Sequence, residues 1–155
     1  MKTKAKTAGI AAITVLTVVA AILAVWLGPR PRLEVFDQKT GEIYYSVPAE
    51  DGLRVTLAWV HSIELAPISV TWEVQDARLF LVERTVESYG AGVDNDLGGV
   101  TTNENGVIRT TGLHIEYPHI NYVHSHNTKH TLLVGEHLIQ TSDIGHHAFV
   151  QIAVR

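Results

Sequence analysis

The histidines of this chain have a spacing that could support metal chemistry. Eight of the nine lie between His114 and His147. His124 and His126 are two positions apart in the expected strand 121–126, so their side chains would share one face at a separation of about 6.5 to 7 Å. Two imidazoles at that separation can converge on one transition metal. We therefore predict a transition-metal site at His124 and His126.

Spacing does not identify a third ligand for this site. The candidates are His130, His137, His146 and His147. Two other interpretations of the histidines stay open: a pH-responsive surface, and ordinary surface or core side chains.

His61 and Ser62 place a base beside a nucleophile, as a hydrolase requires. Consecutive residues of a strand point to opposite faces, so Ser62 could not donate a hydrogen bond to His61 without a turn. A Gly-x-Ser-x-Gly nucleophile elbow is also absent from the sequence. We therefore expect that the protein is not an enzyme.

Four short stretches occur in a recognisable order. They are His61-Ser62-Ile63-Glu64, Pro67-Ile68, Thr71-Trp72-Glu73 and, after the next expected strand, Tyr89-Gly90-Ala91-Gly92. In this order the chain resembles a prokaryotic family of unknown function. Its members are small membrane-anchored proteins, often encoded beside or fused to the permeases of TAXI-type TRAP transporters. The resemblance covers residues 33–155, and its specific part is confined to 61–92.

The resemblance implies partners but no catalytic residues. The implied partners are a TAXI-type TRAP permease, its substrate-binding protein, or both. The implied partner-contact residues are His61, Ser62, Glu64, Trp72, Glu73, Tyr89, Gly90, Ala91 and Gly92.

The sequence beyond residue 32 predicts an all-β fold. Short runs rich in Val, Ile, Thr and aromatic residues alternate with Gly, Asn, Asp and Pro, and no apolar pattern has helical spacing. The expected strands are 33–37, 43–47, 53–61, 68–75, 79–87, 107–111, 114–117, 121–126, 131–134, 137–142 and 149–154. Roughly 9–11 strands in one domain predict a single β-sandwich or small barrel.

Alternation within two of these strands predicts which faces are buried. Val55, Leu57 and Trp59 share one face of the strand 53–61. Ile68 and Trp72 share one face of the strand 68–75. We expect these two strands to pair with both tryptophans on the core side.

Residues 8–27 form an uncharged apolar stretch of twenty positions. A helix of that length spans about 30 Å, the thickness of a bilayer's hydrocarbon core. Lys2, Lys4 and Lys6 precede it, which predicts a cytoplasmic N-terminus. A cleaved signal peptide is the alternative, although small residues are poorly placed for cleavage after the apolar stretch.

Charge is distributed unevenly along the chain. All 16 acidic residues lie beyond residue 32, where seven Lys or Arg remain, so this part has a formal charge of −9 with neutral histidines. Nucleic-acid binding requires a basic surface, so that class is excluded. We expect a cytoplasmic segment 1–7, a transmembrane anchor 8–27, a neck 28–32 and one extracytoplasmic β-domain 33–155.

Three hypotheses follow from these patterns. The leading one is a single-pass accessory subunit of a TAXI-type TRAP transporter. The alternatives are an anchored extracytoplasmic metal-binding domain built on the histidine cluster, and an envelope or cell-surface adhesion module. No tightly bound cofactor is expected apart from the possible transition metal.

Overall fold

The computed structural model describes residues 17–19, 28–87 and 97–155. Beyond residue 31, the described residues contain strands and one 3₁₀ helix, η1 (Thr141–Asp143). The strands are β1 (Arg32–Asp37), β2 (Ile43–Pro48), β3 (Arg54–Val60), β4 (Pro67–Gln75), β5 (Arg78–Val86), β6 (Val100–Glu104), β7 (Val107–Tyr117), β8 (Ile120–Val123), β9 (Thr131–Val134), β10 (His137–Ile139) and β11 (Phe149–Val154).

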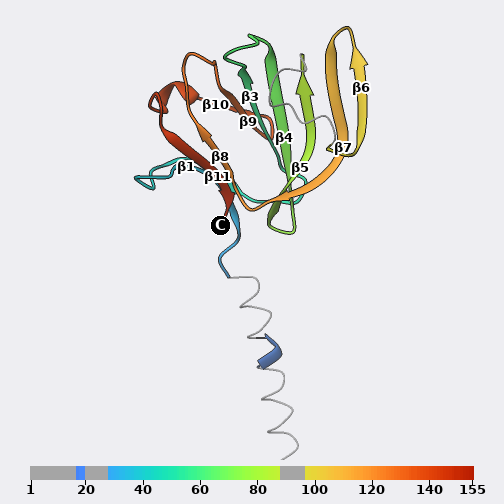
Figure 1. Ribbon diagram of the computed structural model, residues 1–155. Coiled ribbons are helices and arrows are strands. Elements are labelled where there is room, and N and C mark those ends of the chain that lie inside the picture. The colour runs from blue at the N-terminus through green and yellow to red at the C-terminus, as the bar shows by residue number, and fades with distance from the viewer. Residues whose placement is uncertain (1–16, 20–27, 88–96) are drawn as a thin grey trace, which may run out of the picture. The chain divides into compact units, whose positions relative to one another are not determined.

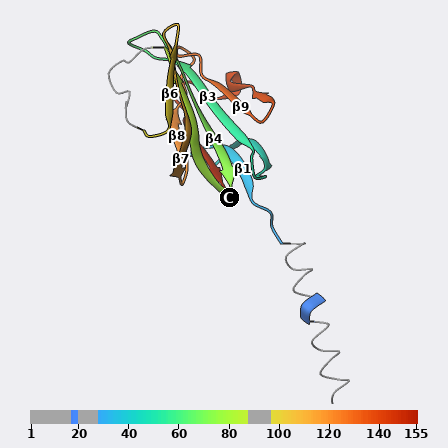
Figure 2. The same ribbon diagram turned by 90° about the vertical axis from the view of Figure 1, so that its right-hand side faces the viewer.

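Two antiparallel sheets pack face to face as a sandwich (Figure 1, Figure 2). The smaller sheet has the strand order β2-β1-β11-β8, and the larger has β10-β9-β3-β4-β5-β7-β6. The sequence-based prediction of an all-β sandwich is therefore confirmed.

Tight turns join consecutive strands where the sequence has turn residues. Asn105 and Gly106 connect β6 to β7 with positive φ angles of 54° and 87°. Asn-Gly favours this geometry, which matches the twist of a β-hairpin. Asp76 and Ala77 make the same kind of turn between β4 and β5, with φ angles of 50° and 56°.

The core lies between the sheets and is built from inward-facing residues at alternate positions. Leu33 and Val35 of β1 are fully buried, as is Val55 of β3. Val55 is paired with Trp72, and Trp59 with Ile68, so β3 and β4 pair with their apolar faces on the same side, as alternation predicts. Val55 and Trp72 form one hydrophobic cluster with buried residues of β5, β9 and β11.

The structure corrects several of the expected strands. β8 ends at Val123, so His126 lies in the turn after it and not on the expected strand 121–126. The expected strands 107–111 and 114–117 form the single strand β7, because Gly112 adopts a φ of 70° where its pairing with β5 is irregular. The sequence does not predict β6, because all its residues are exposed and lack apolar alternation.

The chain divides into two compact units, Met1–Arg30 and Pro31–Arg155. In the first unit, residues 17–19 are helical. Within the part of the chain that the structure describes, no helix is both long and apolar enough to cross a membrane. Most of the predicted anchor, 8–27, lies outside the described residues.

Candidate functional site

The loop between β3 and β4, residues 61–66, carries the first group of predicted contact residues. His61 donates its backbone N–H to the carbonyl of Ala66 at 2.9 Å, and the Leu65 N–H donates to the carbonyl of His61 at 2.9 Å. The Nδ1 of His61 accepts a further hydrogen bond from the Glu64 amide at 3.1 Å. Both the backbone and the side chain of His61 therefore fix the shape of this loop.

The β3–β4 loop exposes two large aliphatic side chains. Ile63 is 78% exposed and Leu65 is 75% exposed, with Ser62 and Glu64 also exposed beside them. Leu65 has a positive φ of 54°, which a bulky residue adopts only when its surroundings impose it. An ordered loop that holds two aliphatic side chains in water is suited to insertion into an apolar groove of a partner.

The β3–β4 loop lies at the end of the sandwich opposite the C-terminus (Figure 1, Figure 2). We refer to this end as the distal end. The turn 126–129 lies at the same end, because Val60 donates its backbone N–H to the carbonyl of Thr128 at 2.8 Å. The distal end therefore brings together His61 and the histidines that follow β8.

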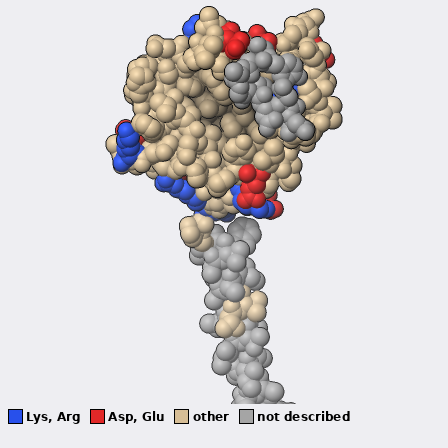
Figure 3. Space-filling view, viewed as in Figure 1, with Lys and Arg blue, Asp and Glu red and all other residues tan. Residues whose placement is uncertain are grey.

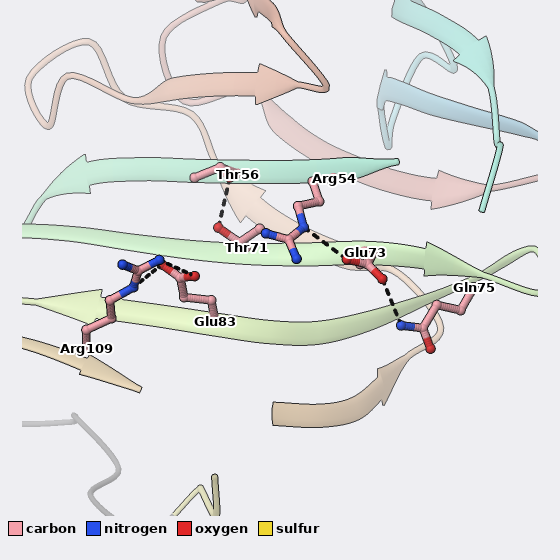
Figure 4. Close-up of polar contacts among 7 residues, drawn as sticks. All are labelled: Arg54, Thr56, Thr71, Glu73, Gln75, Glu83 and Arg109. Carbon is pink, nitrogen blue, oxygen red and sulfur yellow. Dashed lines mark hydrogen bonds and ion pairs between the residues drawn. The ribbon is translucent and has the colours of Figure 1, made fainter. Parts of the chain in front are cut away.

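Trp72 and Glu73 lie on opposite faces of β4. Trp72 is 5% exposed and lies between the sheets. Glu73 lies on the outer face of the larger sheet, where it is paired with Arg54 at 2.9 Å and accepts a hydrogen bond from Gln75 at 3.0 Å (Figure 4). The bonds from Gln75 and Arg54 hold the pKa of Glu73 below its usual value.

The structure therefore does not bring the predicted contact residues onto one surface. His61, Ser62 and Glu64 lie together in the β3–β4 loop, whereas Trp72 faces the interior and Glu73 the outer sheet face. The remaining predicted contact residues, Tyr89, Gly90, Ala91 and Gly92, lie outside the described residues.

The outer face of the larger sheet is covered by polar pairs. Thr56 and Thr71 share a hydrogen bond of 2.8 Å across β3 and β4. Arg109 makes two hydrogen bonds of 2.8 Å to the Glu83 carboxylate (Figure 4). These groups satisfy one another across neighbouring strands, which is the usual arrangement of a solvated sheet face.

The imidazole rings of five histidines lie next to one another at the distal end. We define the histidine cluster as His124, His126, His130, His146 and His147. The centroid of the His124 ring lies 5.1 Å from that of His126 and 5.4 Å from that of His130. The rings of His126 and His146 are 5.3 Å apart, and those of His146 and His147 are 3.9 Å apart.

Hydrogen bonds engage one ring nitrogen each in His126, His130 and His146. His130 Nδ1 accepts from the Ser125 amide at 3.0 Å, and His146 Nδ1 accepts from the His126 amide at 3.2 Å. His126 Nε2 lies 3.0 Å from the carbonyl of Ile144, which requires that nitrogen to be protonated.

His124 is the exception in the histidine cluster. It is 1% exposed, and among the described residues neither of its ring nitrogens has a hydrogen-bond partner. Burial, together with repulsion from His130, His126 and His146, lowers its pKa from 6.5 to about 4. His124 is therefore a neutral, buried imidazole at pH 7.

The metal hypothesis gains no geometric support from this cluster. Although His124 and His126 lie close together, no group of three or more His, Asp or Glu side chains in the described ranges is arranged to hold a metal ion. A pocket of about 450 Å³ beside them is also lined by Lys129, whose charge would oppose a bound cation. The transition-metal site at His124 and His126 stays a prediction.

A cavity between the two sheets is a feature that sequence reasoning missed. Its volume is about 540 Å³, and its lining includes Trp59, Val70, Trp72, Tyr122 and His130. Figure 3 shows a largely uncharged, hollowed surface with the charged residues towards its margins. Alternation places the two tryptophans on the core side, but no local pattern shows that the two sheets leave a partly open pocket between them there.

One comparison with known proteins identifies a family. The model of a domain of unknown function, DUF1850, matches residues 55–140, which is more than half of the chain. The matched range includes the β3–β4 loop, and it contains His124, His126 and His130. Neither the curated proteins nor the solved structures contain a significant match.

Proposed function

We propose that this chain, which belongs to the DUF1850 family, is a single-pass accessory subunit of a TAXI-type TRAP transporter. In this proposal the segment 8–27 anchors the protein in the membrane with its N-terminus in the cytoplasm. The β-domain lies outside the cytoplasm and binds the permease, its substrate-binding protein, or both. The role is one of binding and not of catalysis.

The exposed β3–β4 loop is the observation that carries this proposal. Ile63 and Leu65 are the two most exposed large hydrophobic residues among those described. Exposed apolar groups that become buried against a partner contribute about 25 cal/mol per Å² of apolar surface removed from water. Because the hydrogen bonds of His61 already order the loop, binding would require little further loss of backbone entropy.

The geometry of the loop also favours a protein partner over a membrane surface. Glu64 lies between Ile63 and Leu65 in sequence and is exposed with them. A carboxylate at the tip of the loop would be repelled by anionic lipid headgroups, whereas a protein groove can offer it a donor at its rim. The expected contact is therefore an apolar groove with a polar or basic edge.

The proposal is tested by copurification of the tagged full chain from gently solubilised membranes. We expect TRAP permease or substrate-binding subunits in stoichiometric amounts by mass spectrometry. The double variant Ile63→Ser/Leu65→Ser should lose them while keeping the urea midpoint of the parent. Leu138→Ser is the matched control, because Leu138 is 66% exposed but lies on β10, away from the loop. Recovery of the parent chain as a clean monomer would overturn the proposal.

A further inference from the structure

We propose that the inter-sheet cavity is a binding site for a small aromatic carboxylate. The cavity is lined from β3, β4 and β5 on the larger sheet and from β8 on the smaller one. The inference concerns a small molecule and does not rest on the proposed transporter partner.

The size of the cavity is the first argument. Its volume of about 540 Å³ falls within the range of about 300–1,000 Å³ that is typical of ligand sites. It is partly open to solvent, and β3 and β4 directly beside it pack normally, with Val55 and Val74 fully buried. The empty volume is therefore localised, as expected for a site that a ligand fills.

Aromatic rings supply the walls of this cavity. Trp59 and Trp72 project into it from neighbouring strands, and Tyr117 contacts the Trp72 ring edge-on at 6.1 Å. On the opposite side, the ring of Tyr122 lies 5.2 Å from that of His130. Rings at these angles leave flat faces against which an aromatic ligand can stack or pack edge-on.

Two polar atoms among the lining residues have no hydrogen-bond partner among the described residues. They are Trp72 Nε1 and the hydroxyl of Tyr122, and both are buried. Indole nitrogen can only donate a hydrogen bond, and burial raises the pKa of Tyr122, so its hydroxyl stays protonated and able to donate. A buried donor without an acceptor is unfavourable, so a ligand that brings oxygen acceptors would be selected.

The charge of the lining selects between ligands of similar shape. Arg84 lines the cavity, whereas none of its described lining residues is Asp or Glu. His130 also lines it, and its Nδ1 lies 3.0 Å from the Ser125 amide and 3.1 Å from the Thr128 hydroxyl. The unpartnered donors of Trp72 and Tyr122, with no Asp or Glu among the described lining residues, favour a carboxylate over an amine.

Three matched probes test the proposal on the full chain in one detergent: phenylacetate, phenylacetamide and phenethylamine. Isothermal titration calorimetry should show saturable binding of phenylacetate, at least about tenfold tighter than that of phenethylamine. Val70→Phe places a ring in the cavity and should abolish binding. The parent and this variant are titrated in the same detergent. Partitioning of the probe into micelles therefore contributes equally to both titrations and cancels in the difference between them.

A second pair of variants keeps the test valid if Val70→Phe does not fold. Tyr122→Phe removes one donor and should weaken phenylacetate about 3- to 10-fold, whereas Tyr45→Phe, outside the cavity, should leave affinity unchanged. Absence of saturable binding by all three probes would mean that the cavity holds only water and would overturn the proposal. So would a preference for phenethylamine, or equal binding by parent and a folded Val70→Phe variant.

Discussion

The imidazole Nδ1 of His61 accepts a hydrogen bond of 3.1 Å from the backbone amide of Glu64, three residues along the chain. This hydrogen bond joins the first and fourth residues of the β3–β4 loop. The same residue also uses its backbone N–H and carbonyl to hold Ala66 and Leu65. His61 therefore stabilises the conformation of the loop that exposes Ile63 and Leu65.

Replacing His61 by Ala should loosen this loop without unfolding the domain. The Glu64 amide would lose its acceptor, so its hydrogen exchange should accelerate, while global stability should fall by about 1 kcal/mol or less. Recovery of the partner should fall as the loop loses its order. His61→Asn should restore much of both properties, because an Asn carbonyl can accept from amides two or three residues ahead. Unchanged exchange at Glu64 in His61→Ala would refute this role.

Glu73 should matter for stability and not for partner binding. It lies six residues along β4 from Pro67, about 20 Å from the loop at the usual rise of a strand. Its pairing with Arg54 is partly exposed, so Glu73→Gln should cost about 1 kcal/mol or less in a urea titration. Partner recovery should equal that of the parent chain. A selective loss of the partner would show that the outer sheet face is part of the contact.

Gly99 should tolerate Ala much less well than Gly41, although both have positive φ angles. A Cβ at Gly99, at a φ of +78°, would collide with the carbonyl oxygen of Thr111. A Cβ at Gly41, at a φ of +75°, would meet open space. We expect Gly99→Ala to cost at least about 2 kcal/mol in a urea titration and Gly41→Ala about 1 kcal/mol. Equal losses would show that only the backbone conformation matters.

The sandwich could be predicted because alternation and turn residues act locally. Strands β9 and β11 have the predicted bounds, since each alternates buried and exposed positions in at least part of its length and is bounded by turn residues. β6 could not be found this way, because its neighbour β7 holds it as an edge strand by backbone pairing and not by an apolar face.

The candidate site could be predicted only where its chemistry is local. The sequence predicts His61, Ser62 and Glu64 as contact residues of one stretch, and the structure keeps them in one loop. The proximity of His124 to the His146–His147 pair, by contrast, depends on long-range backbone hydrogen bonds of 2.8 Å, from His124 to the Ala148 carbonyl and from His147 to the His124 carbonyl. The cavity depends on packing between the sheets, for which neither strand alone provides a pattern.

The pH dependence of stability should be dominated by His124 between pH 7 and pH 4. Its pKa is about 4 in the folded protein and 6.5 when unfolded, so the unfolded state binds a proton first as pH falls. Its contribution to stability is therefore fully present above pH 6.5, declines as pH falls towards 4, and totals about 3 kcal/mol at most. Burial also lowers the pKa of His130, which acts in the same direction.

Urea titrations of the full chain at pH 7.5 and pH 4.5, followed by tryptophan fluorescence, measure this effect. His124→Phe removes the titrating ring and keeps an aromatic side chain beside Tyr122, so the loss of stability between the two pH values should shrink by about 2 kcal/mol. At pH 7.5 this variant should be at least as stable as the parent, because the two unpaired ring nitrogens are gone. The exposed His137 provides the control: His137→Gln should keep the parent's pH dependence. If His124→Phe keeps it too, His124 is not the group whose burial makes the folded state sensitive to acid.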